Sequence, residues 1–293
     1  MMLTHCKISE EFNKDDMRAL IESDLKKDLH MHTRYSDGEL TPKELIDMRV
    51  AEGYELLAIT DHDGMGGSVA GAPYAESVGV EFIYGIEFDS EDELGKDLHI
   101  LGYGFDPENE ELMDTLIYVL EERRNRNEKF RDCLNKRGYG IKPEEIWAVN
   151  KGRYVGKPTF ATVLMQKGIV KDVKEAFATI FKEDDLRAIK KVTLATEKVI
   201  EVIHTAGGLA VMAHPMEQRR PDESFEEFKP RMYALMDRMV EYGIDGIECF
   251  HPSASPEQSE LFVAYAKERG LMITRGSDFH SKENRNYDIF HRP

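Results

Sequence analysis

The stretch at residues 28–38, DLHMHTRYSDG, is the part of this 293-residue chain that decides its fold and its chemistry. His30 and His32 lie two residues apart in a run typical of a β-strand, so both imidazoles project from the same face of that strand. Asp37 follows in the loop after the strand, where ligand-binding residues gather in α/β folds. An isolated Asp-Gly pair is more typical of a simple turn, so its meaning depends on its neighbours.

Short β-rich runs alternate with helical patterns after this stretch. The runs are ELLAIT at 55–60, VEFIYGIEF at 80–88, DLHILGYG at 97–104, GGLAVMAHP at 207–215, DGIECFHP at 245–252 and LMITRGSDFH at 271–280. Such alternation predicts an α/β fold with βαβ units and a parallel sheet or barrel. Capping boxes at residues 41–44 and 255–258 predict the start of two of the helices.

The β-rich runs stop between about residues 106 and 191, where the sequence is charged and helix-like. We therefore predict one α/β body formed by residues 26–105 and 192–293, with a small helical cap inserted at 106–191. Residues 1–25 are expected to form an acidic, partly helical extension.

Composition limits the possible partners and compartments. With 39 Lys and Arg against 56 Asp and Glu, the net charge is -17, which disfavours binding to a long nucleic acid. A small phosphorylated substrate remains compatible, because bound divalent ions reverse the field inside a pocket. The cysteines, Cys6, Cys133 and Cys249, show neither disulfide nor metal-finger spacing. No signal peptide or membrane-length apolar run is present, so we expect a cytoplasmic protein.

Chemically active side chains recur at the predicted strand ends. His62 lies between two carboxylates in Thr60–Asp63, although Asp61 or Asp63 could instead cap the following helix. Glu87 lies in an apolar run, where a carboxylate is costly to bury unless it is paired or bound to a metal. His99 and His214, taken singly, are more typical of hydrogen-bonded core histidines.

The last strand ends with Asp278 and His280, which repeat the two-residue spacing seen near the N-terminus. Because nearly every strand end supplies a His, Asp or Glu, we predict a shared metal centre at the C-terminal rim of the sheet or barrel. Nitrogen and carboxylate ligands without thiolate suit Zn, Mn or Fe.

The ordered motifs DLHMHTRYSDG, TDHD, GIEF, AHP and GSDFH resemble those of the PHP (polymerase and histidinol phosphatase) family of phosphoesterases. The resemblance spans about residues 26–105 and 192–281. The helical middle resembles the inserted domain of a subgroup with nucleoside 3′,5′-bisphosphate phosphatases and a cyclic-phosphate phosphodiesterase. This resemblance implies a distorted (β/α)7 barrel with two to three divalent ions at its C-terminal rim.

The family pattern also implies roles for single residues, with hydrolysis by a metal-activated hydroxide. One ion would take His30, His32, Glu87 and Asp278; a second would share Glu87 and add His99 and His214; a third would take Asp37, His62 and His280. Asp37, His62, Glu87, His214 and Asp278 are the expected catalytic residues. The acid that protonates the leaving group stays open between His214, His251 and a bound water.

Substrate recognition is expected from the insertion. Arg123 and Arg126 lie three residues apart on one predicted helix face and could grip a second phosphate, or could form a solvated basic stripe. Lys157 and Thr159 stand where related caps have Arg and His. This difference argues against assigning the substrate of any one relative to this chain. His251, at a strand end, is expected either to face the pocket or to be structural.

The leading hypothesis is hydrolysis of a small phosphorylated metabolite, either a nucleoside 3′,5′-bisphosphate or a cyclic phosphate of ribose or a nucleotide. Alternative enzymes are a histidinol-phosphate phosphatase and a nuclease that trims short RNA from its 5′ end. A metal-binding regulatory domain without turnover is the alternative from another class. It is disfavoured because all nine expected ligand positions are filled. An accessory domain of a polymerase is also conceivable, but no other polymerase feature is present.

Overall fold

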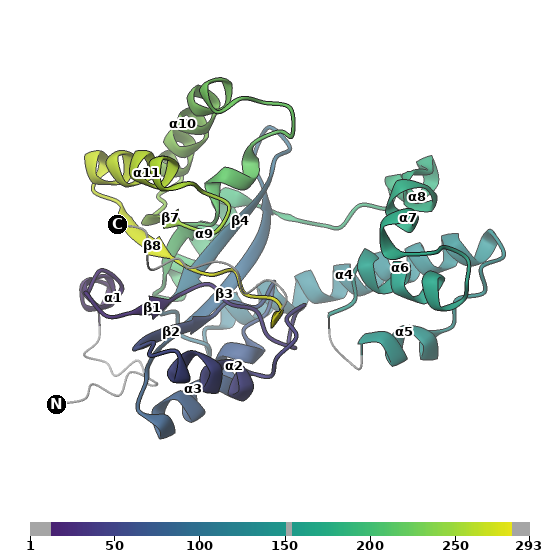
Figure 1. Ribbon diagram of the computed structural model, residues 1–293, viewed down its shortest axis with the longest axis horizontal. Coiled ribbons are helices and arrows are strands. Elements are labelled where there is room, and N and C mark those ends of the chain that lie inside the picture. Colours follow the sequence, from purple (N-terminus) through teal and green to yellow (C-terminus); the bar gives the residue numbers. More distant parts are fainter. Residues whose placement is uncertain (1–12, 151–153, 283–293) are drawn as a thin grey trace. The chain divides into compact units, whose positions relative to one another are not determined.

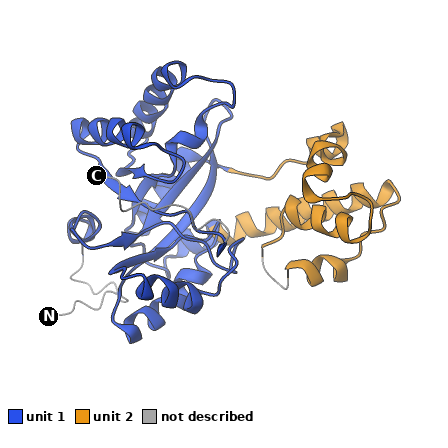
Figure 2. Ribbon diagram, viewed as in Figure 1, with its two compact units in different colours: residues 1–115, 194–293 blue, residues 116–193 orange. Residues whose placement is uncertain are grey.

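The computed structural model describes residues 13–150 and 154–282. The first part of the expected N-terminal extension, residues 1–12, lies outside the described residues. The chain divides into two compact units, residues 1–115 with 194–293, and residues 116–193 (Figure 2). We refer to them as unit 1 and unit 2.

Unit 1 is built around a barrel-shaped sheet (Figure 1). Seven strands follow one another in the order β1 Lys27–Asp28, β2 Leu56–Ile59, β3 Glu81–Glu91, β4 Asp97–Tyr103, β6 Leu209–Met212, β7 Gly246–Phe250 and β8 Met272–Arg275; β5, Leu194–Ala195, pairs with β3. The two ends of this order nearly meet, because the Leu29 amide donates to the Arg275 carbonyl at 3.1 Å and Met31 forms a bridge with Phe279. The predicted distorted seven-stranded barrel is confirmed.

Strand β4 is the exception to the predicted parallel pairing, because it runs antiparallel to both β3 and β6. A tight turn joins it to β3, in which the Asp92 amide donates to the Lys96 carbonyl at 2.9 Å. Parallel pairing needs a crossover of a dozen or more residues, which this connection lacks. The start of β4 therefore lies beside the carboxyl ends of the parallel strands.

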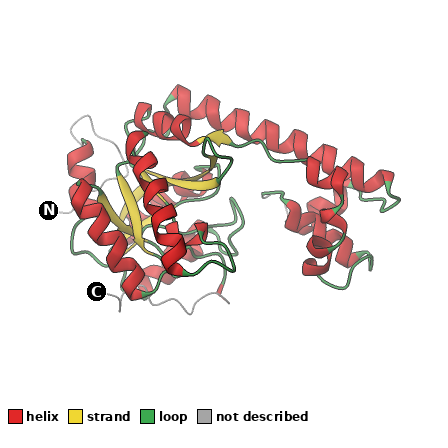
Figure 3. Cartoon of the chain, turned by 90° about the horizontal axis from the view of Figure 1, so that it is seen from above, coloured by secondary structure: helices red, strands yellow, loops and turns green. Residues whose placement is uncertain are grey.

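Helices pack around the outside of the barrel (Figure 3). They are α2 Pro42–Ala51, α3 Gly66–Val78, α9 Thr196–Thr205, α10 Phe225–Glu241 and α11 Pro256–Arg269. Both predicted capping boxes are present, at Thr41 with Glu44 and at Ser255 with Gln258. Each box pairs two backbone amides that the helix itself leaves without acceptors.

Alternation along the strands separates two hydrophobic clusters in unit 1. Leu56 and Ala58 of β2 belong to a cluster with Tyr103, whereas Leu57 and Ile59 belong to a second cluster with residues of α2 and α3. Helix α1, Lys14–Ile21, adds its buried residues Met17 and Ile21 to the first cluster. The described end of the N-terminal extension is thus part of the barrel core.

Helices and the loops between them make up the described residues of unit 2. Helix α4, Glu110–Lys136, begins in unit 1 and is followed by α5 Pro143–Asn150, α6 Lys157–Gln166, α7 Val173–Ala178, the 3₁₀ helix η1 Ile180–Lys182 and α8 Asp184–Ala188. Phe130, Phe160 and Phe181 lie in its core, with ring centroids 5.1 Å apart for Phe130–Phe160 and Phe130–Phe181. Among the described helices of the chain, none has the length and apolar character needed to span a membrane.

Candidate metal centre

Two histidines that follow β1 meet two carboxylates, one on β3 and the other in the segment after β8. The His32 Nε2 atom lies 3.2 Å from Glu87 Oε2 and 3.1 Å from Asp278 Oδ1. The His30 Nε2 atom lies 3.4 Å from both Glu87 Oε1 and Asp278 Oδ1. These four side chains, predicted to share one ion, are brought together by the fold.

The same Glu87 carboxylate joins a second group of ligand atoms. Its Oε1 atom lies 2.9 Å from His99 Nδ1 and 3.1 Å from His214 Nε2. His99 reaches this rim because β4 is antiparallel and begins where its parallel neighbours end. The predicted second set is therefore also close together.

A third group lies on the other side of His32. Asp37 Oδ1 is 3.3 Å from His280 Nε2, and Asp37 Oδ2 is 3.8 Å from His62 Nε2. The His280 ring stacks on the His32 ring at a centroid separation of 4.1 Å. His62 also approaches the shared carboxylate, with Nδ1 3.1 Å from Glu87 Oε2. One continuous cluster thus contains all nine predicted ligands.

Several buried ligand atoms in this cluster lack a hydrogen-bond partner within the described part of the chain. They are His30 Nε2, His32 Nε2, Glu87 Oε2 and His214 Nδ1. Leaving such a group unsatisfied costs about 1–3 kcal/mol each, so native proteins seldom bury many together. Coordination to divalent ions would satisfy imidazole nitrogens and carboxylate oxygens of this kind. The residues therefore fit a metal centre with nitrogen and oxygen ligands.

Electrostatics in the cluster favour ionised carboxylates. Burial opposes the ionisation of Glu87, but the imidazoles of His62, His30 and His99 outweigh it and hold its pKa well below the usual value. Burial lowers the pKa of His62 to about 4, which keeps that ring in the neutral form that binds metals. For His32, burial is outweighed by the carboxylates of Asp278 and Glu87, which lie 3.1 and 3.2 Å from its Nε2 atom and raise its pKa to about 10. A metal ion must displace that proton.

Backbone strain is concentrated at the same rim. Among the described residues other than glycine, three have positive φ: Asp63 at 47°, His214 at 27° and Asp278 at 50°. Such conformations cost of order 1–3 kcal/mol and persist where the surrounding structure enforces them, often at functional sites. Two of the three are predicted metal ligands.

The helix-cap alternative for Asp61 and Asp63 is wrong. Helix α3 has Met65 as its N-cap residue, without a side-chain cap. Asp61 instead accepts hydrogen bonds from the backbone amides of Thr33, at 2.8 Å, and Ser36, at 3.1 Å, and from both of their hydroxyls. It therefore holds the loop that carries Asp37, a role that the sequence did not indicate.

Glu248 is a further residue that the sequence reasoning missed. One of its oxygens lies 3.0 Å from His30 Nδ1, and the other accepts a hydrogen bond from the His214 amide at 2.8 Å. It is buried in the apolar strand GIECF, which is the same signal that singled out Glu87. Because a carboxylate accepts, the Nδ1 of His30 carries a proton, which leaves Nε2 as the nitrogen that would bind a metal.

A second missed network holds the segment before Asp278. The Ser277 hydroxyl and amide donate to the two oxygens of Asp28 at 2.6 and 2.9 Å, and Arg49 lies 2.8 Å from the same carboxylate. Arg49 also donates to the Ser277 hydroxyl at 2.8 Å. This buried network fixes the backbone that leads into Asp278.

His251 lies at the edge of the cluster and is almost fully buried, with 4% of its surface exposed. Its Nε2 atom is 3.4 Å from Asp278 Oδ2. Its Nδ1 atom accepts a hydrogen bond from the Ser253 amide at 3.1 Å and lies 2.7 Å from the Ser253 hydroxyl. The residue therefore faces the predicted metal ligands.

The residues predicted to bind substrate in the insertion lie in unit 2. Arg123 and Arg126 are buried, so the solvated-stripe alternative is wrong. The Arg123 guanidinium lies 4.2 Å from the centre of the Tyr154 ring. Burial, followed by the charge of Arg126, lowers the pKa of Lys157. Contact of Arg123, Arg126 and Lys157 with a substrate stays a prediction.

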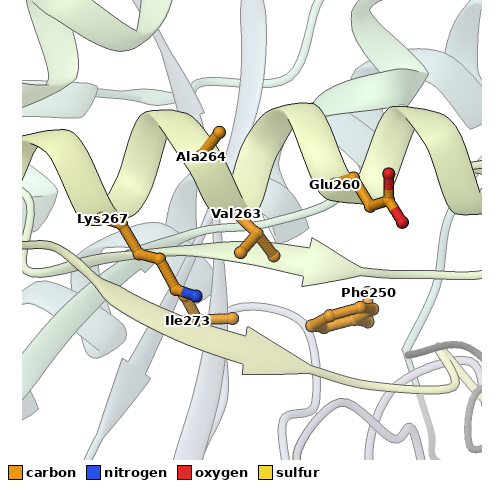
Figure 4. Close-up of a pocket in the computed structure, with 6 residues that line it drawn as sticks. All are labelled: Phe250, Glu260, Val263, Ala264, Lys267 and Ile273. Carbon is orange, nitrogen blue, oxygen red and sulfur yellow. The ribbon is translucent and has the colours of Figure 1, made fainter.

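A separate apolar pocket lies between α11 and strands β7 and β8 (Figure 4). Its lining residues are Phe250, Glu260, Val263, Ala264, Lys267 and Ile273. None of the predicted metal ligands is among them, so this pocket is distinct from the cluster.

The barrel and its histidine-carboxylate rim define the class of the protein as an α/β barrel with a candidate metal centre. Residues 28–250 match the family described as the PHP domain, which is more than half of the chain. The chain belongs to the PHP domain family.

Individual relatives resemble nearly the whole chain. A 5′-3′ exoribonuclease of Haemophilus influenzae is 31% identical over 255 residues, which are 87% of this chain and 90% of that protein. A 3′,5′-nucleoside bisphosphate phosphatase of Chromobacterium violaceum is 31% identical over 267 residues, 90% of each chain. A phosphoribosyl 1,2-cyclic phosphate 1,2-diphosphodiesterase of Eggerthella lenta is 29% identical over 262 residues, 88% of this chain and 95% of that protein.

A solved structure from Bifidobacterium adolescentis, provisionally described as a metal-dependent phosphoesterase, is also similar. It superposes with a TM-score of 0.75 at 27% identity, covering 92% of both chains. Family, fold and cluster together make this protein a metal-dependent phosphoesterase, an enzyme that hydrolyses phosphate esters.

Proposed function

We propose that this enzyme hydrolyses a small phosphorylated metabolite, namely a nucleoside 3′,5′-bisphosphate or a cyclic phosphate of ribose or a nucleotide. The observation that carries the proposal is the single cluster in which Glu87 approaches His30, His32, His62, His99 and His214. The names of the Chromobacterium and Eggerthella relatives support the substrate class.

We propose that the cluster holds two to three divalent ions and that these ions are Mn, Zn or Fe. His30, His32, Glu87 and Asp278 would hold the first ion, Glu87 with His99 and His214 the second, and Asp37, His62 and His280 the third. When bound, such ions supply Lewis-acid catalysis, activate water and screen the charge of the phosphate.

Other side chains of the protein position the predicted ligands and bind the substrate. Glu248 orients His30 and the backbone of His214, and Asp61 orients the loop that carries Asp37. The ionised Glu87 and Asp278 keep the rim ready to receive cations. We assign Asp37, His62, Glu87, His214 and Asp278 as the catalytic residues, and Arg123, Arg126, Lys157 and His251 to substrate binding.

A second candidate is 5′-to-3′ trimming of short RNA, favoured by the name of the Haemophilus relative. The net charge of -17 argues for short ends and against long strands. We place the enzyme in the cytoplasm, which agrees with the free thiols of Cys133 and Cys249.

The test is phosphate release from a panel with Mn²⁺ supplied or removed by a chelator. The panel contains a nucleoside 3′,5′-bisphosphate, a ribose cyclic phosphate, histidinol phosphate and a short 5′-phosphorylated RNA. We expect the first or second substrate to be turned over fastest, with activity lost in chelator. Preference for the RNA would favour the second candidate, and preference for histidinol phosphate would refute both. If metal-loaded protein releases phosphate from none of these substrates, the result would favour a regulatory role without turnover.

A further inference from the structure

We propose that His251 donates a hydrogen bond from its Nε2 atom to the substrate phosphate and is not a metal ligand. This inference rests on the proposed function, because it assumes a phosphate ester at the cluster. It gives the imidazole ring a role different from that of the nine predicted ligands.

The tautomer follows from the contacts of Nδ1. The Ser253 amide donates to this atom at 3.1 Å, and a backbone N–H can only donate. The Nδ1 atom therefore carries a lone pair, and the Ser253 hydroxyl at 2.7 Å can donate to it as well. Because an imidazole ring carries at least one N–H, the other nitrogen then bears the hydrogen. The Nε2 atom of His251 is thus a donor.

His30 shows the opposite arrangement at a ring-centroid distance of 6.1 Å. Its Nδ1 faces the acceptor Glu248, so its Nε2 is the nitrogen that would supply a lone pair to a bound metal. A ligand histidine needs that lone pair, whereas an Nε2–H group cannot coordinate a metal. The different partners therefore give the two rings different roles. Glu248 makes His30 a metal ligand, and Ser253 makes His251 a hydrogen-bond donor.

The position of His251 suits contact with a phosphate. Its Nε2 atom approaches Asp278 Oδ2 at 3.4 Å, whereas Asp278 Oδ1 faces His30 and His32. The ring follows directly after β7 and is almost fully buried, so its direction is fixed. A donor fixed beside the ligand atoms meets a phosphoryl oxygen without reorganisation.

The first test reads the tautomer without any activity measurement. In ¹⁵N-labelled protein loaded with diamagnetic Zn²⁺, imidazole nitrogen shifts are assigned to His251 by comparison with the His251→Gln variant. We expect Nδ1 to be unprotonated and Nε2 to be protonated. A proton on Nδ1, or a zinc-bound Nε2, would overturn the inference.

The second test is calorimetric binding of inorganic phosphate to the metal-loaded protein. We expect His251→Ala to weaken phosphate binding by roughly tenfold to a hundredfold, the loss typical of one hydrogen bond to a charged group. His251→Gln, whose amide N–H takes the place of Nε2, should recover most of the affinity. His204→Gln, which changes a histidine paired with Asp245 elsewhere in the barrel, is the matched control and should bind like the wild type.

The outcomes separate this inference from the proposed function. Tight phosphate binding by wild type and His251→Ala alike would refute the role of His251 and leave the phosphoesterase proposal intact. A fall in metal content of His251→Ala would mean that the ring positions Asp278, which would also refute it. If the wild type hydrolyses no phosphate ester and binds no phosphate, both the inference on His251 and the proposed function are refuted.

Discussion

Replacing Glu248 by glutamine should weaken metal binding without unfolding the barrel. The carboxylate accepts from His30 Nδ1 at 3.0 Å and from the His214 amide at 2.8 Å. A glutamine of the same shape has only one acceptor oxygen, so one contact becomes a donor facing a donor. If the His30 ring responds by moving its proton to Nε2, that atom can no longer bind a metal.

The expected size of the effect follows from these two contacts. An unsatisfied buried donor costs about 1–3 kcal/mol, and loss of a partner behind a metal-bound histidine typically costs 10–100-fold in metal affinity. These values agree, since about 1.4 kcal/mol corresponds to a tenfold change. Competition with a chromogenic chelator for Zn²⁺ measures the affinity directly.

Asp245→Asn is the matched control for this experiment. Its Oδ2 atom accepts from both His204 Nε2 and the Ala210 amide at 2.7 Å, which is the same chemistry at the start of the strands. It should leave Zn²⁺ affinity unchanged, with a stability loss of about 1–3 kcal/mol at most. A Glu248→Gln variant that binds Zn²⁺ within threefold of wild type would refute the role given to Glu248.

Three further outcomes are expected. His32→Ala and Asp278→Ala should each lower turnover by roughly a hundredfold or more, with less bound metal by elemental analysis and an unchanged circular dichroism spectrum; normal turnover would exclude the assigned centre. Because the pKa of His32 is raised to about 10, Zn²⁺ binding at pH 8 should release a proton, and the affinity for Zn²⁺ should rise as the pH approaches that value. Calorimetry in buffers of different ionisation enthalpy would measure the proton release. Binding without proton release would contradict the charge state assigned to His32. In Gly276→Ala the new Cβ would lie 2.0 Å from His30 Cβ and 2.7 Å from Glu248 Oε1. Thermal unfolding should therefore show a destabilisation of about 1–3 kcal/mol, and metal titration should show weaker metal binding. An unchanged melting temperature and metal affinity would mean that the backbone at Gly276 shifts freely.

The sequence predicted the barrel and the gathering of His, Asp and Glu side chains because both depend on local patterns. Alternating runs mark the strands, and parallel strands bring their carboxyl ends to one edge, so residues after each strand must meet. Glu87 could be singled out because a carboxylate in an apolar run is costly. The same reasoning would have found Glu248.

Other features depend on pairing that a single sequence does not encode. The antiparallel direction of β4 is an exception, because the connection between the runs at 80–88 and 97–104 is too short for a parallel crossover and the sequence already contained this signal. The support of the Asp37 loop by Asp61 joins residues of two neighbouring strands, and the network of Asp28, Arg49 and Ser277 joins both ends of the chain. The insertion has a hydrophobic core of its own, so its sequence pattern does not specify a partner in the barrel.

The join between β1 and β8 has a consequence for how the protein responds to metal. These strands meet through the Leu29 amide and the Met31–Phe279 bridge, whereas β3 and β4 share a long ladder. His30 and His32 lie on one side of this join, and Asp278 and His280 on the other. Bound ions would therefore link two strands that share no continuous backbone ladder. Stripping the metal should accelerate amide hydrogen exchange first in the segments at 29–32 and 276–280, while the β3–β4 hairpin stays protected.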